Sequence, residues 1–226
     1  MIGWRRLSRA AMLFGLALGA VPALAQEHVV LAPAAAATGP EAPGLHQAIF
    51  AGGCFWGVAG VFAHVRGVTR VVAGYDGGAA ATAHYDRIEE GDTGHAESVR
   101  VTYDAAKIGY ADLLRVFFSV ITDPTTLNRQ GADTGTQYRS MLIPLEPAQR
   151  QMATAYIAQL SAARTWGAPI VTTISPDKGF YPAEAYHQNF MADHPDNGYI
   201  AFWDAPKLAA FKRLFPALYV PRAARN

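Results

Sequence analysis

The stretch AGGCFWGVAGVF, residues 51–62, contains the only cysteine of the 226-residue chain and indicates the local fold around it. Just before it, residues 46–53 (HQAIFAGG) predict a short strand that ends in a tight turn, because isoleucine and phenylalanine favour β structure and two glycines break the run. Over residues 54–65, apolar side chains recur every three or four positions, which is typical of one face of a helix. We therefore expect Cys54 at a strand-to-helix junction, at the helix N-terminus.

This position favours a reactive thiol over an inert one. Unpaired backbone N–H groups and the positive end of the helix dipole stabilise an anion, so we expect the pKa of Cys54 to lie below its ordinary value of about 8.5. A single cysteine cannot form an internal disulfide, which leaves a buried structural residue or a nucleophile. Phe55 and Trp56 follow the thiol and either pack in the core or line a small apolar pocket.

The composition indicates an ordinary globular domain and excludes several classes of function. The chain has 51% hydrophobic and 16% charged residues and a formal net charge of +1, so nucleic acid and anionic lipid are not expected partners. The seven histidines have no metal-ligand spacing, and the Walker loop and the H-E-x-x-H motif are both absent. We expect no bound metal and no nucleotide cofactor.

The N-terminal part of the chain predicts a targeting segment followed by a linker. Residues 1–25 combine early arginines, an apolar run and an Ala-Leu-Ala site, which together are typical of a secretory signal peptide. The apolar run is too short to span a membrane, so we expect cleavage after Ala25, export to the periplasm and no stable membrane insertion. Residues 26–45 are rich in Ala, Pro and Gly and predict a flexible linker. The folded domain is expected over residues 46–226.

The remaining segments predict strands and helices in an irregular alternation. Hydrophobic alternation predicts strands over residues 68–78, 96–104, 136–145 and 169–175. Three- and four-residue spacing predicts helices over residues 110–121, 146–163 and 206–214, and residues 176–194 are expected to form a loop. Because there is no regular βαβ repeat, we expect an α+β fold, a mixed sheet with helices packed on it.

Five segments resemble the peptide methionine sulfoxide reductase A family in the same order. They are GGCFWG, GYDGG, GDTGHAESVRVTYD, FFSVITDPTTLNRQGADTGTQYRS and FYPAEAYHQNF, and the similarity covers nearly all of residues 46–195. The resemblance implies the ferredoxin-like two-layer core of that family. It also implies an enzyme that reduces (S)-methionine sulfoxide, free or in oxidised proteins, and so reverses one step of methionine oxidation.

The resemblance implies four catalytic residues. Cys54 attacks the sulfoxide sulfur and is left as a sulfenic acid. Glu97 protonates the sulfoxide oxygen, because a carboxyl in an apolar site has a raised pKa and stays neutral near pH 7. Tyr85 and Tyr138 donate hydrogen bonds to the same oxygen.

Further residues are implied to bind the substrate. Phe55 and Trp56 hold the methyl group of the oxidised side chain. Asp133 shapes the site through hydrogen bonds. His187 either contacts the substrate or orients its loop, whereas His95 is expected to be structural.

Two departures from the family pattern affect the mechanism. Many members carry a resolving cysteine at the position of Glu89, and often more near the C-terminus, but this chain has none there. The sulfenic acid must then be resolved by an external thiol, either a thioredoxin-like protein or a small thiol. In addition, residues 77–86 lack the Asn-Pro that commonly precedes the tyrosine, which bears on how Tyr85 reaches the site.

Two other classes of function remain open at this point. A thiol peroxidase or cysteine hydrolase would use Cys54 with His187 as base and Asp133 as the group that orients it. A non-catalytic module would keep the fold and capture methionine-rich partners without turnover. The protein is expected to be a monomer.

Overall fold

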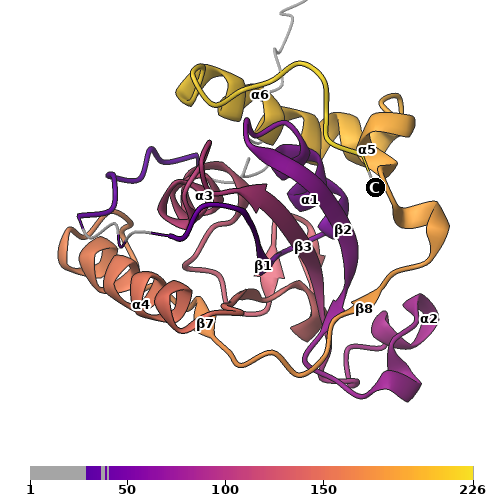
Figure 1. The fold of residues 1–226 in the computed structure, drawn as a ribbon. Coiled ribbons are helices and arrows are strands. Elements are labelled where there is room, and N and C mark those ends of the chain that lie inside the picture. Colours follow the sequence, from indigo (N-terminus) through magenta and orange to yellow (C-terminus); the bar gives the residue numbers. More distant parts are fainter. Residues whose placement is uncertain (1–28, 37–38, 40, 226) are drawn as a thin grey trace, which may run out of the picture.

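The protein is described here from a computed structural model, which covers residues 29–36, 39 and 41–225. The predicted signal peptide lies outside these residues. A six-stranded mixed sheet with the order β7-β6-β1-β3-β2-β8 forms the centre of the molecule (Figure 1). Its strands are β1 (Leu45–Gly52), β2 (Val68–Asp76), β3 (Ala96–Asp104), β6 (Ser140–Ile143), β7 (Thr173–Ile174) and β8 (Tyr181–Pro182).

The central four strands have the topology of a ferredoxin-like core. Strands β6, β1, β3 and β2 lie side by side, and each pairs with its neighbour in antiparallel register. The chain forms them in the order strand, helix, two strands, helix, strand, which is the split βαβ arrangement. This confirms the predicted α+β class with helices packed on a mixed sheet.

The helices cover one face of this sheet. Alternate residues of β1 point to opposite faces, and so they join two different apolar clusters. Ala48 and Phe50 join the main core beneath the helices, whereas Ile49 and Ala51 join a small apolar cluster on the other face. The main helices are α1 (Phe55–Ala63), α3 (Tyr110–Val116), α4 (Pro147–Ala162) and α6 (Ala205–Leu214). All four contribute buried side chains to the main core.

The predicted helices form, with one change of winding. The segment predicted over residues 110–121 begins as α3 and ends in a π-helical turn, Phe117–Ile121, in which all five side chains are buried. Helix α4 begins at Pro147, where the missing N–H leaves no intrahelical bond unmade. Short elements complete the chain: α2 (Tyr85–Ile88), α5 (Phe190–Asp193), β4 (Arg129–Gln130), β5 (Asp133–Thr134), a second π-helical turn (Ile200–Asp204) and single turns at Ala80–Thr82, Thr136–Tyr138 and Ala185–His187.

Two predicted strands are shorter than expected, and the predicted loop contains regular structure. The segment over residues 136–145 is extended only at β6, because its first residues form the turn Thr136–Tyr138. Only two residues of 169–175 pair as β7. Within residues 176–194, β8 pairs with β2 and extends the sheet.

We predicted a flexible linker over residues 26–45, but the described residues of this segment pack on the domain (Figure 1). Ala32 is fully buried. Its backbone N–H donates to Oγ of Ser119 at 3.0 Å, and its carbonyl accepts from Nε of Arg115 at 2.9 Å. The Tyr156 hydroxyl donates to the carbonyl of Pro33 at 2.6 Å. Small side chains let this extended chain lie close to α3 and α4, where its backbone finds polar partners.

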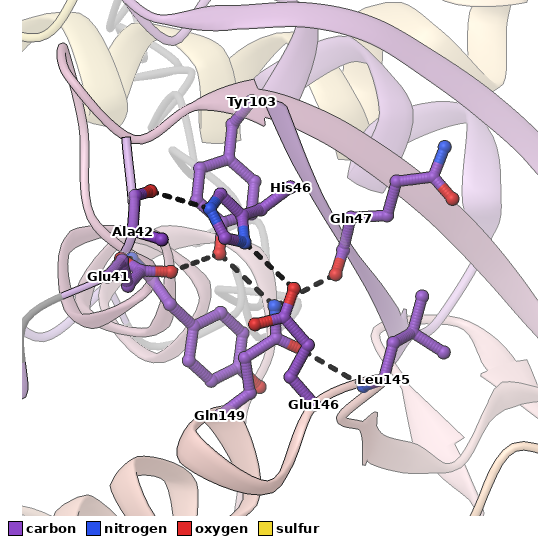
Figure 2. A network of polar contacts seen from close by, with 9 residues as sticks. Glu41, Ala42, His46, Gln47, Tyr103, Leu145, Glu146 and Gln149 are labelled. Carbon is purple, nitrogen blue, oxygen red and sulfur yellow. Dashed lines mark hydrogen bonds and ion pairs between the residues drawn. The ribbon is translucent and has the colours of Figure 1, made fainter. Parts of the chain in front are cut away.

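A polar network holds the second half of this segment, so the domain does not begin at residue 46 (Figure 2). The Glu41 carboxylate accepts hydrogen bonds from the Tyr103 hydroxyl and from the backbone N–H of Tyr110. His46 bridges the carbonyl of Ala42 and the carboxylate of Glu146, with 2.8 Å to each. Among the helices that the structure describes, none is long and apolar enough to cross a membrane.

Candidate active site

Cys54 lies at the junction between β1 and α1, as the sequence predicts. It immediately precedes the helix and is only 8% exposed. The turn before it needs glycine: Gly53 has a φ of +96°, and a Cβ there would lie 2.6 Å from Cβ of Gln130. A Cβ on Gly52 would lie 2.8 Å from the Phe117 ring. The two glycines therefore let the chain turn sharply against the core and present the thiol at the helix N-terminus.

Glu97 is the acid beside this thiol. It belongs to β3, is 2% exposed, and accepts a 2.8 Å hydrogen bond at Oε2 from the backbone N–H of Phe55, the first residue of α1. Burial raises the pKa of Glu97 well above its ordinary value, and this outweighs the Phe55 bond, which lowers it. Nearby carboxylates raise it further, chiefly that of Glu89. The side chain is therefore held as a neutral acid.

The pKa of Cys54 was expected to be low, but the structure gives the opposite direction. Burial raises the pKa of the thiol well above its ordinary value, and the carboxyl groups of Glu97, Asp204 and Asp133 act in the same direction. The backbone N–H of Trp56, part of the first helical turn, lowers the pKa but does not outweigh them. Desolvation thus exceeds the effect of the helix N-terminus, and Cys54 rests as a thiol.

Tyr85 is the first residue of α2, and the half-buried carboxylate of Glu184 fixes the start of that helix. The backbone N–H of Tyr85 donates to Oε1 of Glu184 at 2.9 Å, while Oε2 of the same carboxylate accepts from the Tyr75 hydroxyl at 2.8 Å. The loop that lacks Asn-Pro is therefore anchored to β2 by Glu184. Burial raises the pKa of the Tyr85 phenol, which keeps it a hydrogen-bond donor.

Tyr138 ends a short helical turn that is tied to the beginning of β3. The guanidinium of Arg139 donates to the carbonyl of His95 at 3.0 Å and to that of Gly94 at 2.9 Å. This places Tyr138 near Glu97. Burial is the main cause that raises the pKa of the phenol, and Glu97 raises it further once it ionises. His95 also accepts from the N–H of Gly78 at 3.2 Å, a contact that holds the neighbouring glycine turn.

Phe55, Trp56 and His187 form an aromatic cluster at the start of α1. The Phe55 ring is 1% exposed and lies 4.9 Å from the imidazole of His187, centroid to centroid. Trp56 stacks on Phe190 at 3.8 Å and 11°, and its Nε1–H donates to Nδ1 of His187 at 3.0 Å. Because Nδ1 accepts this bond, His187 is neutral, and burial lowers its pKa. His187 thus fixes the orientation of the Trp56 indole.

Asp133 does not form a triad with Cys54 and His187. Its carboxylate accepts a hydrogen bond from the hydroxyl of Tyr199, whereas Nδ1 of His187 is occupied by Trp56. The arrangement required for a cysteine hydrolase is therefore not assembled. Among the residues that the structure describes, no group of three or more His, Cys, Asp or Glu side chains could hold a metal ion.

A wall of the site that the sequence does not predict comes from the C-terminal part of the chain. The ring of Tyr199 lies edge-on to Trp56 at 5.9 Å. Asp204 is fully buried against α1, where a Cβ on Gly57 would lie 2.1 Å from its Oδ1, and Lys207 approaches the same oxygen to 4.0 Å. A glycine inside a helix can mark such a close approach, but the sequence does not show which segment fills the space.

Comparisons with known proteins identify relatives of this chain. The family model described as "Peptide methionine sulfoxide reductase" matches residues 46–217. Peptide methionine sulfoxide reductase MsrA 2 of Mesorhizobium japonicum is 56% identical over 178 residues, which are 79% of this chain and 91% of that protein. MsrA of Deinococcus radiodurans is 50% identical over 75% of this chain and 82% of its own length.

Solved structures show the same fold. The crystal structure of Mxr1 from Saccharomyces cerevisiae in reduced form is 34% identical, covers 69% of this chain and 88% of its own, and has a TM-score of 0.59. Methionine sulfoxide reductase A of Corynebacterium diphtheriae is 31% identical, with a TM-score of 0.57 over 68% of this chain and 77% of its own.

Proposed function

The chain belongs to the peptide methionine sulfoxide reductase family, and from this premise we propose that Cys54 carries out the reduction of (S)-methionine sulfoxide alone and is regenerated by an external thiol. The enzyme is an oxidoreductase that reduces methionine sulfoxide and thereby repairs oxidised methionine. The observation that carries the assignment of residues is the buried Glu97 carboxyl, which is bonded to the first N–H of the helix that presents Cys54.

The oxidised side chain is bound by apolar and polar groups on opposite sides of the sulfur. Its methyl group contacts Phe55 and Trp56. His187 sets the orientation of Trp56 by accepting a hydrogen bond from the indole N–H, and it also lies against the Phe55 ring. Its oxygen accepts hydrogen bonds from the phenols of Tyr85 and Tyr138 and from neutral Glu97. Binding of free methionine sulfoxide requires the same contacts as binding of an oxidised protein, so both are substrates.

The reduction moves one oxygen atom from the substrate to Cys54. As the cysteine sulfur attacks the sulfoxide sulfur, Glu97 gives its proton to the oxygen. The thiol proton of Cys54 then restores the acid form of Glu97. The attack forms a bond between the two sulfurs. The protonated oxygen then moves from the substrate sulfur to the Cys54 sulfur as the sulfur–sulfur bond and the sulfoxide S–O bond break, so methionine leaves. Cys54 becomes a sulfenic acid, and the sulfur of the substrate is reduced while that of the cysteine is oxidised.

A second thiol must come from outside the chain, because Cys54 is its only cysteine. A thiol of a thioredoxin-like protein or a small thiol attacks the sulfenic sulfur and forms a mixed disulfide, and the thiol proton leaves with the displaced hydroxyl as water. A further thiol breaks that disulfide and returns Cys54. The reductase works without a bound metal or organic cofactor in this scheme.

Single-turnover reduction tests the proposal. The mature enzyme, without added thiol, is mixed with methionine-(S)-sulfoxide, and released methionine and the intact protein mass are measured. We expect one methionine for each enzyme molecule and a mass gain of one oxygen on Cys54, with neither in the Cys54→Ser variant. No methionine and an unmodified thiol in a folded sample would contradict the proposal, and consumption of the R epimer alone would contradict the stereochemistry.

The N-terminal sequence pattern further supports export, with the mature monomer acting in the periplasm. Fractionation of expressing bacteria, followed by N-terminal sequencing, tests this point. Mature protein that begins at Gln26 in the periplasmic fraction is the expected result, and a full-length cytoplasmic protein would contradict it.

A further inference from the structure

The Tyr138 hydroxyl, which the proposed function assigns to the substrate oxygen, is held by a different acceptor in the structure. It donates to Oε1 of Glu89 at 2.9 Å. A phenol has one proton, and a carboxylate can only accept, so Tyr138 cannot donate to Glu89 and to a sulfoxide at the same time. The Tyr85 hydroxyl has no comparable acceptor among the described residues, so the two phenols of the site differ.

Glu89 is placed for this contact by both segments that it joins. It directly follows α2, and its backbone N–H donates to the carbonyl of Tyr85 at 3.0 Å. Its own carbonyl accepts from Nε2 of Gln137, the residue before Tyr138, at 3.4 Å. The side chain is exposed and bonds to a phenol that is partly buried. Glu89 therefore lies at the rim of the site with its carboxylate directed to Tyr138.

We propose that Glu89 is a positioning residue of the reductase, which holds the Tyr138 hydroxyl in the empty site and yields it to the sulfoxide oxygen when substrate enters. This inference rests on the role proposed above for Tyr138. Substrate binding then exchanges a hydrogen bond to a charged acceptor for one to a sulfoxide, so Glu89 weakens binding of the substrate while it keeps the phenol aligned. A residue at the place of the family's resolving cysteine thus acts on the reduction step instead.

The charge of Glu89 has a second effect that a purely structural side chain would lack. After burial, the Glu89 carboxylate is the group that raises the pKa of Glu97 most. The other titratable groups facing Glu97 are Cys54, Tyr75, Tyr85, Asp133, Tyr138 and Asp204. Removing the Glu89 charge should let Glu97 ionise at lower pH and so bring the alkaline loss of activity to lower pH.

The test is a set of single-turnover measurements on wild type and on Glu89→Gln, which keeps the shape and an acceptor oxygen but not the charge. The rate of methionine release is followed against substrate concentration and pH. We expect the half-saturating concentration to fall about threefold, because a hydrogen bond to a neutral acceptor is weaker. The maximal rate should stay within about twofold, and the alkaline limb of the pH profile should move to lower pH.

Two controls make the result specific. Glu90→Gln removes the neighbouring exposed carboxylate, which pairs with Arg87 instead of a tyrosine, and should change neither quantity. In a Tyr138→Phe background the effect of Glu89→Gln on half-saturation should disappear, because the bond it weakens is absent. The inference would be overturned by a threefold change of the half-saturating concentration in the Tyr138→Phe background. It would also be overturned if Glu89→Gln changed neither the half-saturating concentration nor the pH dependence of the rate. Wild type that releases no methionine would instead refute the proposed function itself.

Discussion

The Glu97 carboxyl and the backbone N–H of Phe55 are joined by a 2.8 Å hydrogen bond, which ties the acid of β3 to the first turn of the helix that presents Cys54. The bond orients one carboxylate oxygen, and burial keeps the group neutral. Cys54 and Glu97 are thus held by two elements of the core that this bond joins. In the proposed reaction, it keeps the proton donor in a fixed place beside the single thiol.

Glu97→Gln should slow single-turnover reduction about 100- to 1,000-fold, because an amide can accept the Phe55 bond but cannot protonate the sulfoxide oxygen. The thermal midpoint should change little, since the substitution preserves shape in a buried site. Stopped-flow methionine release and thermal unfolding check both statements. A Gln variant that keeps a rate within threefold of wild type would show that another group supplies the proton.

His187→Leu should raise the half-saturating concentration of substrate several-fold and leave the maximal rate less affected. The change removes the acceptor of the Trp56 indole N–H, so the wall that contacts the methyl group loses its fixed orientation. Steady-state kinetics with excess thiol measure the two quantities separately. His187→Gln, which can present an acceptor oxygen, is the matched control and should recover much of the affinity; equal losses in both variants would argue against this role.

Gly57→Ala should destabilise the protein and disturb helix α1, which presents Cys54 to the site. The new Cβ would lie 2.1 Å from Oδ1 of the buried Asp204, so helix α1 or the C-terminal segment must shift, at a cost of about 1–3 kcal/mol. Urea unfolding of the variant measures the loss. Gly167→Ala, where a Cβ meets nothing within 4 Å, is the control and should be close to neutral. Equal stability of the two variants would show that the Asp204 contact is not as tight as described.

The core of the fold and the position of the thiol were predictable because they depend on local patterns. Alternation along β3 and the stripe of α1 depend on which residues face the core, and both are short-range signals. The glycine pair before Cys54 marks a turn for the same reason. The roles of Glu97 and Tyr138, by contrast, came from the family resemblance and not from any spacing.

Other features were not predictable because they depend on contacts between distant segments. Residues 29–36 bind through their backbone carbonyls and amides, so their Ala- and Pro-rich sequence has no hydrophobic period to detect. Tyr199 and Asp204 reach α1 from the far end of the chain. The direction of the Cys54 pKa depends on how deeply the sulfur is buried among carboxyl groups, which a helix N-terminus alone does not reveal.

His46 should make the attachment of the N-terminal segment depend on pH (Figure 2). Its Nδ1 lies 2.8 Å from the Glu146 carboxylate and its Nε2 lies 2.8 Å from the carbonyl of Ala42. Both partners can only accept, so both bonds exist together only in the imidazolium form. The bond to Glu146, followed by that to Ala42, raises the pKa of His46 above its ordinary 6.5. The stabilisation is complete below pH 6.5 and is lost as pH rises through the folded pKa.

Urea unfolding of wild type and His46→Gln between pH 5.5 and about pH 9 measures this effect. The stability difference between the two proteins should be largest at the acid end and shrink with rising pH, while proteolysis of wild type within residues 29–44 becomes faster. His64→Gln is the control, because that imidazole bonds to the carbonyl of Gly60 and has no carboxylate partner among the residues that the structure describes. A difference that stays constant over the whole range would show that His46 contributes only packing, since a neutral ring would then satisfy the site as well as the imidazolium.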